Sequence, residues 1–457
     1  MLDLIVIGGG PGGYGAAEFA ARHGMTVALV ERDRLGGTCL HRGCVPTKAY
    51  LHAAETARQA EACAPGVLAA FDRHAMFAQK NALVETLTQG IATRMKAGKV
   101  TVYAGQATLL NSGAPFRVQI TGPDAPSETL ECAHVLLATG SVPARLPVEG
   151  CDDPDVWTSD DLLGAAGAES FQSLLIVGGG VIGVEMACIY ARLGVTVTVL
   201  EAEKRCLPML ELELGRSVEA LLKSMGVTVL TDARLERLMR TSTGFTAAYR
   251  KNDAAGEVSA ARVLLSTGRL PATDGLLGLG VTLAMERRAI AVDDTFATSL
   301  PGVYAIGDVN NRCPLAHAAH AQGVAAVSAM LGVPSPIDPT LVPSCVYTRP
   351  EIAAVGLTQE EAAAQGIATV VGKALATQNA RMLIEELGRG FVKLVFARDT
   401  HVLLGAQLFC GNATDLVGEL TLAVRSGLTA EQLLLSVRAH PTFEETITDA
   451  VEAARFA

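Results

Sequence analysis

Two cysteines five positions apart, Cys39 and Cys44, are the residues of this chain best suited to chemistry. They stand in the segment Gly-Gly-Thr-Cys-Leu-His-Arg-Gly-Cys-Val-Pro-Thr-Lys (residues 36–48), shortly after a glycine-rich nucleotide-binding signature. A thiol pair there predicts electron transfer between a disulfide and a bound cofactor. Five residues of regular helix span roughly 7.5 Å, beyond the about 7 Å between Cα atoms that a disulfide permits. If the cysteines bond, the helix must be distorted, and Gly43 and Pro46 would allow that.

Composition excludes several other uses for these thiols. The chain has 457 residues, ten cysteines and a formal net charge of −10. Apart from Cys39 and Cys44, no cysteine pair repeats at metal-ligand spacing, and a zinc site built on these two would lack its other ligands, so no metal is expected. A disulfide framework is typical of much shorter secreted chains, which favours a reducing compartment. No basic stripe is present, which argues against nucleic acid as a partner.

The N-terminus has neither the basic flank nor the cleavage site of a signal peptide. The apolar run over 174–200 contains Glu185, Arg192 and several glycines, so a buried strand–helix–strand is expected instead of a membrane span. We therefore expect a cytoplasmic protein with no membrane partner.

The sequence repeats itself at an offset of 170 residues. Each copy predicts an apolar strand, a glycine-rich turn, a helix, and a second strand closed by an acid, Glu31 or Glu201. The matching segments are 4–10 with 174–180, and 21–27 with 191–197. This is the pattern of the βαβ dinucleotide-binding unit, and its duplication with both acids in place makes a chance match improbable.

Each glycine of the pattern has a physical role. The first makes the tight turn, the second lets the backbone approach a pyrophosphate at the helix N-terminus, and the third allows close packing of strand and helix. The acids can accept hydrogen bonds from a ribose diol. The glycines are Gly8, Gly10 and Gly13 in the first copy, and Gly178, Gly180 and Gly183 in the second.

Two nucleotide sites and one dithiol predict two different cofactors. A nicotinamide moves a hydride, a disulfide is opened by a thiolate, and a flavin can do both. This assigns FAD to the first unit, beside the cysteines, and NAD to the second. Glu201 favours NAD because a 2′-phosphate would meet a negative charge there, although Arg205 stands close by.

Two charged pairs are candidates for the chemistry. Glu185 aligns with Gly15 of the first copy and is expected in the first helical turn, where Lys48 could pair with it close to the flavin ring. The alternative is two solvated surface charges. His440 has Glu445 five residues later, a pairing that could serve acid–base catalysis. His440 could equally be a turn residue before Pro441, and His41 in the cysteine segment is expected to pack on its own helix.

The remaining elements complete an α/β chain with a separate C-terminal unit. Residues 135–141 resemble 263–269, and each segment predicts a late buried strand ending near a cofactor. Helix is expected over 49–98 and short strands over 100–138 and 226–265. After about residue 340, strands over 391–411 and amphipathic helices over 412–426 and 444–456 predict an α+β unit.

Several segments together resemble the class I pyridine nucleotide–disulfide oxidoreductases, and within that family the dihydrolipoamide dehydrogenases. The match runs nearly end to end, and the segments that carry it are 36–39, 43–48, 304–309, 315–317, 347–351 and 440–442. The resemblance implies two Rossmann-like domains, for FAD and NAD, and a C-terminal α+β dimerisation domain. The implied boundaries are 1–145 and 271–340 for FAD, 146–270 for NAD, and 341–457 for the interface.

The resemblance also implies the roles of individual residues. Cys39 would meet the substrate, Cys44 would lie against the flavin, and the two would form the redox disulfide. Lys48 and Glu185 would pair near the flavin's reactive nitrogen, while His440, held by Glu445, would be the acid–base catalyst contributed by the other subunit of a homodimer. Further cofactor-binding residues would be Thr38, Gly105, Ser141, Gly268, Asp308 and Ala316.

The implied activity is oxidation of dihydrolipoamide with NAD⁺. The partner would be a lipoylated protein of a 2-oxoacid dehydrogenase complex or the glycine cleavage system, on a separate chain because the first strand starts by residue 3. Another NAD(P)H-dependent disulfide reductase, or a flavin-bound redox sensor without catalysis, is the alternative. Arg438 replaces a histidine usual in the family and could alter the substrate channel. His320 and Gln322 also depart from the family pattern, while Cys313 and Cys345 are expected to be structural.

Overall fold

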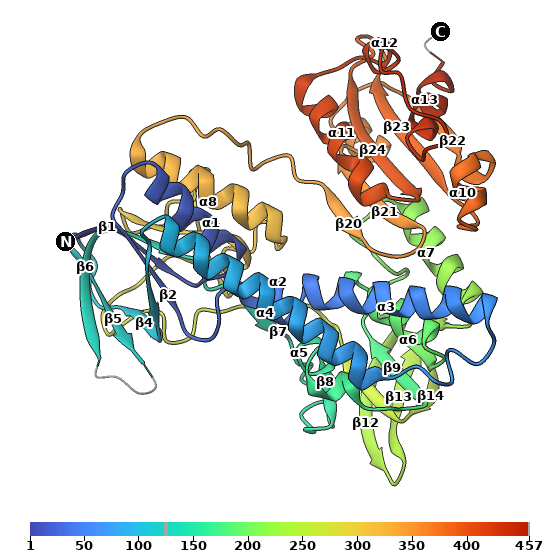
Figure 1. Ribbon diagram of the computed structural model, residues 1–457, viewed down its shortest axis with the longest axis horizontal. Coiled ribbons are helices and arrows are strands. Elements are labelled where there is room, and N and C mark those ends of the chain that lie inside the picture. Colours follow the sequence, from blue (N-terminus) through green and yellow to red (C-terminus); the bar gives the residue numbers. More distant parts are fainter. Residues whose placement is uncertain (123–126, 456–457) are drawn as a thin grey trace.

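The first sheet combines strands from both ends of the first 305 residues. The computed structural model describes residues 1–122 and 127–455 (Figure 1). The strand order is β3-β2-β1-β6-β5-β4, and β19 pairs in parallel with β6. The central strands are continuous apolar runs, as a parallel sheet covered on both faces requires. The strands are β1 (Leu2–Ile7), β2 (Val27–Glu31), β3 (Thr101–Ala104), β4 (Gln106–Leu109), β5 (Phe116–Thr121), β6 (Glu128–Leu137) and β19 (Val303–Ala305).

Helices α1 and α8 pack together beside this sheet, α2 and α3 carry the cysteine segment, and α4 follows them (Figure 1). The helix predicted over 49–98 is in fact two helices, because Pro65 and Gly66, with φ +101°, interrupt it. The short strands expected over 100–138 are present. The helices are α1 (Pro11–Arg22), α2 (Gly37–Arg42), α3 (Cys44–Cys63), α4 (Arg73–Ala97) and α8 (Ala316–Leu331).

The second sheet reproduces the core of the first. Its order is β11-β10-β9-β15-β8, all parallel, and an antiparallel ladder β12-β13-β14 lies beside it. Leu4 pairs with Val27 in the first sheet, and Leu174 pairs with Val197 in the second, which is the predicted offset of 170. The elements are β8 (Val156–Thr158), α5 (Ser159–Leu162), η1 (Ala165–Ala168), β9 (Ser173–Val177), α6 (Val181–Arg192), β10 (Thr196–Leu200), α7 (Leu212–Ser224), β11 (Thr228–Leu230), β12 (Ala233–Thr241), β13 (Gly244–Lys251), β14 (Ala254–Ala260) and β15 (Arg262–Leu265).

A short antiparallel ladder joins the two units. In it, β7 (Ser141–Pro143), where the chain leaves the first unit, pairs with β16 (Arg269–Pro271), where it returns. The domain boundaries predicted after residues 145 and 270 lie near these strands and remain a proposal. The return segment also contains β17 (Met285–Glu286), β18 (Ala289–Ile290) and η2 (Gly307–Val309).

The C-terminal part is an antiparallel sheet with helices. Its order is β20-β21-β24-β23-β22, and it confirms the predicted α+β unit. The last predicted helix is observed over Glu445–Glu452, while residue 456 lies outside the described residues. The elements are β20 (Ser344–Val346), β21 (Glu351–Gly356), α9 (Gln359–Ala364), β22 (Thr369–Leu375), η3 (Ala376–Gln378), α10 (Ala380–Ile384), β23 (Phe391–Ala397), β24 (Leu403–Cys410), α11 (Ala413–Ser426), α12 (Ala430–Leu433) and α13 (Glu445–Glu452).

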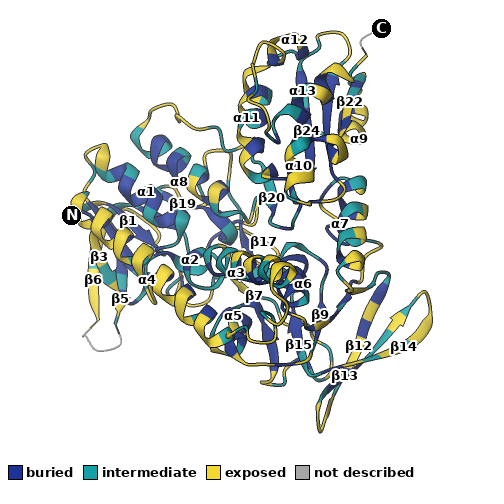
Figure 2. Cartoon of the chain, turned by 45° about the vertical axis from the view of Figure 1, so that its right-hand side comes forward, coloured by how far each residue is buried: buried dark blue, intermediate teal, exposed yellow. Residues whose placement is uncertain are grey.

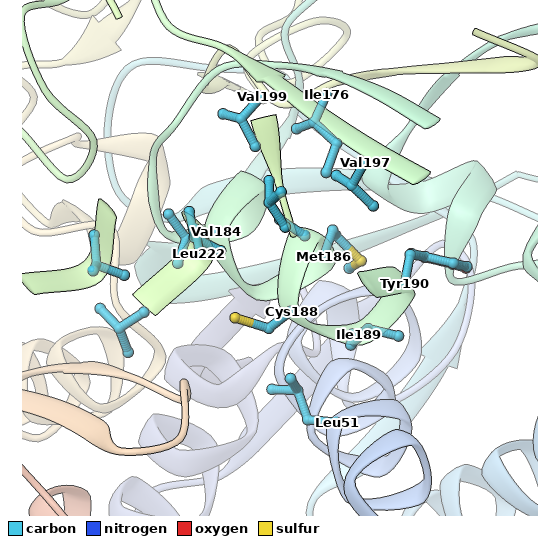
Figure 3. Packing of buried hydrophobic residues seen from close by; sticks show 14 of the residues in the cluster. Leu51, Ile176, Val184, Met186, Cys188, Ile189, Tyr190, Val197, Val199 and Leu222 are labelled. Atoms are coloured by element: carbon cyan, nitrogen blue, oxygen red, sulfur yellow. The ribbon is translucent and has the colours of Figure 1, made fainter. Parts of the chain in front are cut away.

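The core of the second unit fixes the position of α3. Ile176, Val197 and Val199 of the sheet pack beneath Val184 and Met186 of α6 (Figure 3). On the same helix, Ile189 lies toward Leu51 of α3, so this core continues into the helix that begins at the second cysteine. Buried residues follow the sheets and inner helix faces, whereas the outer face of α4 is exposed (Figure 2). Among the described residues, no helix is long and apolar enough to cross a membrane.

Candidate active site

The cysteine segment forms two helices separated by one glycine. Cys39 lies on α2, Cys44 is the first residue of α3, and Gly43 between them has φ −148° and ψ −114°, which is not helical. A Cβ at Gly43 would lie 2.9 Å from the backbone oxygen of Thr38, so a side chain there would crowd the segment. The distortion expected at Gly43 is therefore present, and it brings the two thiols within hydrogen-bond reach of each other.

Electrostatics give the two thiols different acidities. The pKa of Cys39 is raised, first by its hydrogen bond with Cys44 and then by burial. The pKa of Cys44 is lowered to about 7, first by the hydrogen bond from Cys39 and, against the effect of burial, by the charge of Lys48. Cys44 is thus the thiol that carries the negative charge, and thiolates are the reactive form of cysteine.

Lys48 and Glu185 form the ion pair expected across the two units. Lys48 Nζ lies 2.9 Å from Glu185 Oε2 and 3.1 Å from Oε1. The Glu185 side chain is 4% exposed, so this carboxylate is not one of two solvated surface charges. Glu185 was expected in the first turn of its helix. It is the fifth residue of α6 and therefore lies just beyond that turn. The chain advances into the second turn before the side chain can reach Lys48 of α3.

The two glycine-rich turns have the same geometry. Gly8 and Gly178 have φ +108° and +110°, values that L side chains rarely adopt. Gly10 and Gly180 are the N-cap residues of α1 and α6, and neither helix has a side-chain cap or an acid in its first turn, so both helix N-termini are free to bind a pyrophosphate. A Cβ at Gly13 would lie 1.8 Å from a backbone oxygen, which requires glycine for the strand–helix contact.

The two strand-terminal acids also match. Glu31 accepts hydrogen bonds from the backbone N–H groups of Gly9, at 2.7 Å, and Asp33, at 2.8 Å. Glu201 accepts the equivalent bonds from Gly179 and Glu203. Each carboxylate therefore holds its own turn in place and still has free lone pairs for a ribose diol.

A single large cavity connects these parts. Its volume is about 2010 Å³, about twice the upper end of the range for one ligand pocket, roughly 300–1,000 Å³. This size suits two dinucleotides. The predicted site residues that line it are Gly8, Gly10, Glu31, Thr38, Cys39, Cys44, Lys48, Gly105, Ser141, Gly178, Gly180, Glu185, Glu201, Gly268, Asp308 and Ala316.

Ser141, the first residue of β7, contacts Asp308 at one end of the β7–β16 ladder. The Ser141 hydroxyl donates to Asp308 Oδ2 at 2.5 Å, and Arg269 Nε donates to the Ser141 oxygen at 2.7 Å. Gln322, one of the departures from the family pattern, is buried and accepts a hydrogen bond from the Gly307 N–H at 2.8 Å. Arg269 therefore supports Asp308 through Ser141, and Gln322 supports it through the neighbouring residue Gly307. Neither Arg269 nor Gln322 was among the predicted site residues.

His440 and Glu445 are close together but away from the cavity. His440 Nδ1 is 2.8 Å from Glu445 Oε1, and the pKa of Glu445 is lowered, first by the backbone N–H of Thr442 and then by His440. Neither residue is among those that line the cavity. His440 lies between α12 and α13, and Glu445 is the first residue of α13; these helices stand at the end of the C-terminal sheet away from α2 and α3 (Figures 1 and 2). Within one chain, the predicted acid–base pair therefore does not meet the thiols.

Arg438 lies at the base of the loop that carries His440. Its side chain is 3% exposed and donates to Glu419 at 2.6 Å and to Thr448 Oγ1 at 2.9 Å. It therefore ties this loop to α11 and α13, and an effect of Arg438 on the substrate channel stays a prediction. His41, which was expected to pack on its own helix, places Nε2 2.8 Å from the carbonyl oxygen of Leu35, in the turn that precedes α2.

Comparison with known proteins covers the whole chain. Residues 2–323 match the family model described as pyridine nucleotide-disulphide oxidoreductase, and residues 342–451 match its dimerisation domain. A dihydrolipoyl dehydrogenase of Bacillus subtilis is 38% identical over 99% of this chain and 98% of its own, and one of Chlorobaculum parvum is 38% identical over 99% and 97%.

Solved structures show the same fold. The crystal structure of LpdA from Mycobacterium tuberculosis superposes with a TM-score of 0.89 at 30% identity, over 99% of both chains. The HOCl-induced flavoprotein disulfide reductase RclA from Escherichia coli gives 0.86 at 26% identity, over 98% of this chain and 99% of its own. The chain therefore belongs to the pyridine nucleotide–disulphide oxidoreductase family and is a flavoprotein disulfide oxidoreductase with a dimerisation domain.

Proposed function

We propose that this protein is an FAD-containing dihydrolipoamide dehydrogenase that uses NAD⁺. The observation that carries the proposal is the continuous cavity, which one dithiol and both glycine-rich turns line together. Net turnover converts dihydrolipoamide and NAD⁺ to lipoamide, NADH and one proton. The B. subtilis and C. parvum relatives, which are named dihydrolipoyl dehydrogenases, support this substrate.

The residues present fit the two cofactors. The N-terminus of α1, Glu31 and Asp308 would hold FAD, and the N-terminus of α6 with Glu201 would hold NAD. When bound, the flavin supplies the coupling between thiol and hydride chemistry. The chain supplies the thiols, keeps the negative charge on Cys44, and holds Lys48 one helical turn away on the same face of α3.

The remaining steps need a proton acceptor and a second subunit. Cys39 is the half-buried thiol that would exchange with the substrate, and a substrate thiol must lose a proton to attack it. We propose that His440, oriented by Glu445, accepts that proton from its place on the partner copy of a homodimer. The matching dimerisation domain supports this arrangement, since one chain alone keeps His440 away from the cavity.

The second nucleotide site favours NAD over NADP. Glu201 and the exposed Glu203 both line the cavity where a 2′-phosphate would have to lie. Arg205, the nearby cation, donates instead to the carbonyl oxygens of Pro208, at 2.9 Å, and Leu210, at 2.8 Å. A lipoylated protein as the partner completes the proposal, because the relatives are named dihydrolipoyl dehydrogenases.

A second candidate is reduction of another disulfide. The likeness to RclA, named an HOCl-induced disulfide reductase, favours it. We would assay turnover with dihydrolipoamide and NAD⁺ against glutathione disulfide with NADH or NADPH. We expect the first to exceed the others by orders of magnitude. A yellow protein whose flavin is not reduced by dihydrolipoamide would refute the dehydrogenase and favour a sensor.

Two variants test the assigned relay. Cys44→Ser is expected to abolish lipoamide turnover while direct electron transfer from NADH to a dye continues, and full lipoamide activity would refute the relay. His440→Gln should slow the lipoamide half-reaction by roughly 10²–10⁴-fold, the usual contribution of a general base, with flavin content unchanged. The exposed His52→Gln is the matched control. Equal loss of flavin and turnover in His440→Gln would mean a folding role.

A further inference from the structure

Tyr347 connects the C-terminal part of the chain to Lys48, the lysine of the ion pair with Glu185. It follows strand β20, lines the cavity, and places the centre of its ring 4.2 Å from Lys48 Nζ. Its backbone N–H donates to Glu185 Oε1 at 2.9 Å. One residue from a distant segment therefore contacts both members of the ion pair.

The contacts leave the ammonium little freedom. Lys48 Nζ donates to both oxygens of Glu185, and the Tyr347 ring covers another side of it. An aromatic face attracts a cation without accepting its proton. Because Lys48 is 31% exposed on its side chain, water would compete for the ammonium if the ring were absent.

The phenol itself is not an acid or base at neutral pH. Burial, followed by the nearby charge of Cys345, raises the pKa of Tyr347 to about 12. The phenol stays neutral in the pH range where Cys44 titrates. The ring face and the peptide N–H are therefore the groups through which Tyr347 can act.

We propose that Tyr347 is a positioning residue that holds the Lys48 ammonium beside Glu185 and toward the Cys44 thiol, and so sets the acidity of that thiol. The inference rests on the proposed function, since Cys44 is its redox thiol. Lys48 and Cys44 are four residues apart on α3 and share a face. The other titratable groups at this point are Tyr14 from α1, Cys39 from α2, Glu185 from α6 and Cys345 from β20.

The test measures Cys44 directly, without turnover. The reduced full-length protein is alkylated with iodoacetamide between pH 5 and 9, and peptide mass spectrometry separates Cys44 from Cys39. In Tyr347→Leu, we expect the midpoint of the Cys44 profile to rise by roughly half to one pH unit, the shift that loss of a cation–π contact would give. Below the midpoint this means roughly three- to tenfold slower alkylation.

Two further variants at position 347 test the same contact if the leucine variant folds poorly. Tyr347→Phe keeps the ring face and should keep the profile within about 0.2 unit. A fluorinated phenylalanine at position 347 keeps the shape but weakens the ring's attraction for a cation, and should shift the profile like leucine. The control is Phe77→Leu, which removes a ring 4.3 Å from Lys80 on α4, a lysine that donates to Asn81 and Leu163, and should leave the profile unchanged.

An unshifted profile in both the leucine and fluorinated variants would overturn the inference. A shift in Tyr347→Phe as large as in Tyr347→Leu would do so as well, because the hydroxyl would then be responsible. The result is separable from the proposed function. A shifted profile in a protein without lipoamide turnover refutes the function and keeps the positioning role.

Discussion

Replacing Glu201 by glutamine should weaken binding of NAD(H) while leaving FAD in place. The carboxylate is 7% exposed and accepts hydrogen bonds from the backbone N–H groups of Gly179 and Glu203. Glutamine keeps the shape but removes the charge, and its NH₂ group cannot accept a hydrogen bond from the ribose diol. A hydrogen bond to a charged group contributes about 1.5–3 kcal/mol, and each 1.4 kcal/mol corresponds to about tenfold in the dissociation constant.

We therefore expect NADH to bind about 10- to 100-fold more weakly to the Glu201→Gln protein. The preference for NAD over NADP should also shrink, because the charge that repels a 2′-phosphate is gone. The assay is titration of NADH with the flavin content measured in the same sample. Flavin should remain bound, since Glu31 holds the first turn by its own pair of hydrogen bonds.

The charge-matched control is Glu203→Gln. Glu203 lines the same cavity and is exposed. We expect its NADH affinity to stay within about threefold of the parent protein, since an exposed charge is screened by solvent. Equal weakening in the two variants would show that overall charge governs binding, and the argument from hydrogen bonds between Glu201 and the ribose would then be wrong.

Two further predictions concern the thiols and the first turn. Lys48→Met should raise the pKa of Cys44 and Glu185→Gln should lower it, because the first change removes a cation and the second an anion; the hydrogen bond from Cys39 stays. Each shift should be about one unit by the alkylation profile, and shifts of the same sign would contradict the charge argument. Gly13→Ala should abolish flavin retention, because its Cβ would lie 1.8 Å from a backbone oxygen, whereas Gly90→Ala, with no atom within 4 Å, should retain flavin and unfold at the same or a slightly higher temperature.

The parts of the fold that could be predicted from the sequence depend on local pattern. The repeat at 170 residues indicated both sheets, both turns and both acids because strand, turn and helix follow one another directly along the chain. The break at Gly43 was also predictable, since helix geometry and disulfide geometry conflict there. The split at Pro65 and Gly66 was missed, although the signal is present in those two residues.

The parts that could not be predicted depend on contacts between distant segments. Tyr347 is 299 positions after Lys48, and nothing in either segment says that the ring covers the ammonium. The orientation of the Arg438 side chain is set by Glu419 and Thr448, which come close to it only in the folded chain. For Glu185, charge complementarity indicated the correct partner, although its position in the first turn was wrong.

The ladder between β7 and β16 has a practical consequence for building chimeric enzymes. The chain enters the second unit after Pro143 and returns at Arg269, and these two residues face each other as paired strand neighbours. The roughly 125 residues between them could therefore be exchanged as one cassette with two adjacent splice points, the geometry in which domain insertions are best tolerated. Because Arg269 donates hydrogen bonds to Ser141 at that junction, the second splice point should leave this arginine in the recipient chain to keep the contact with the first unit.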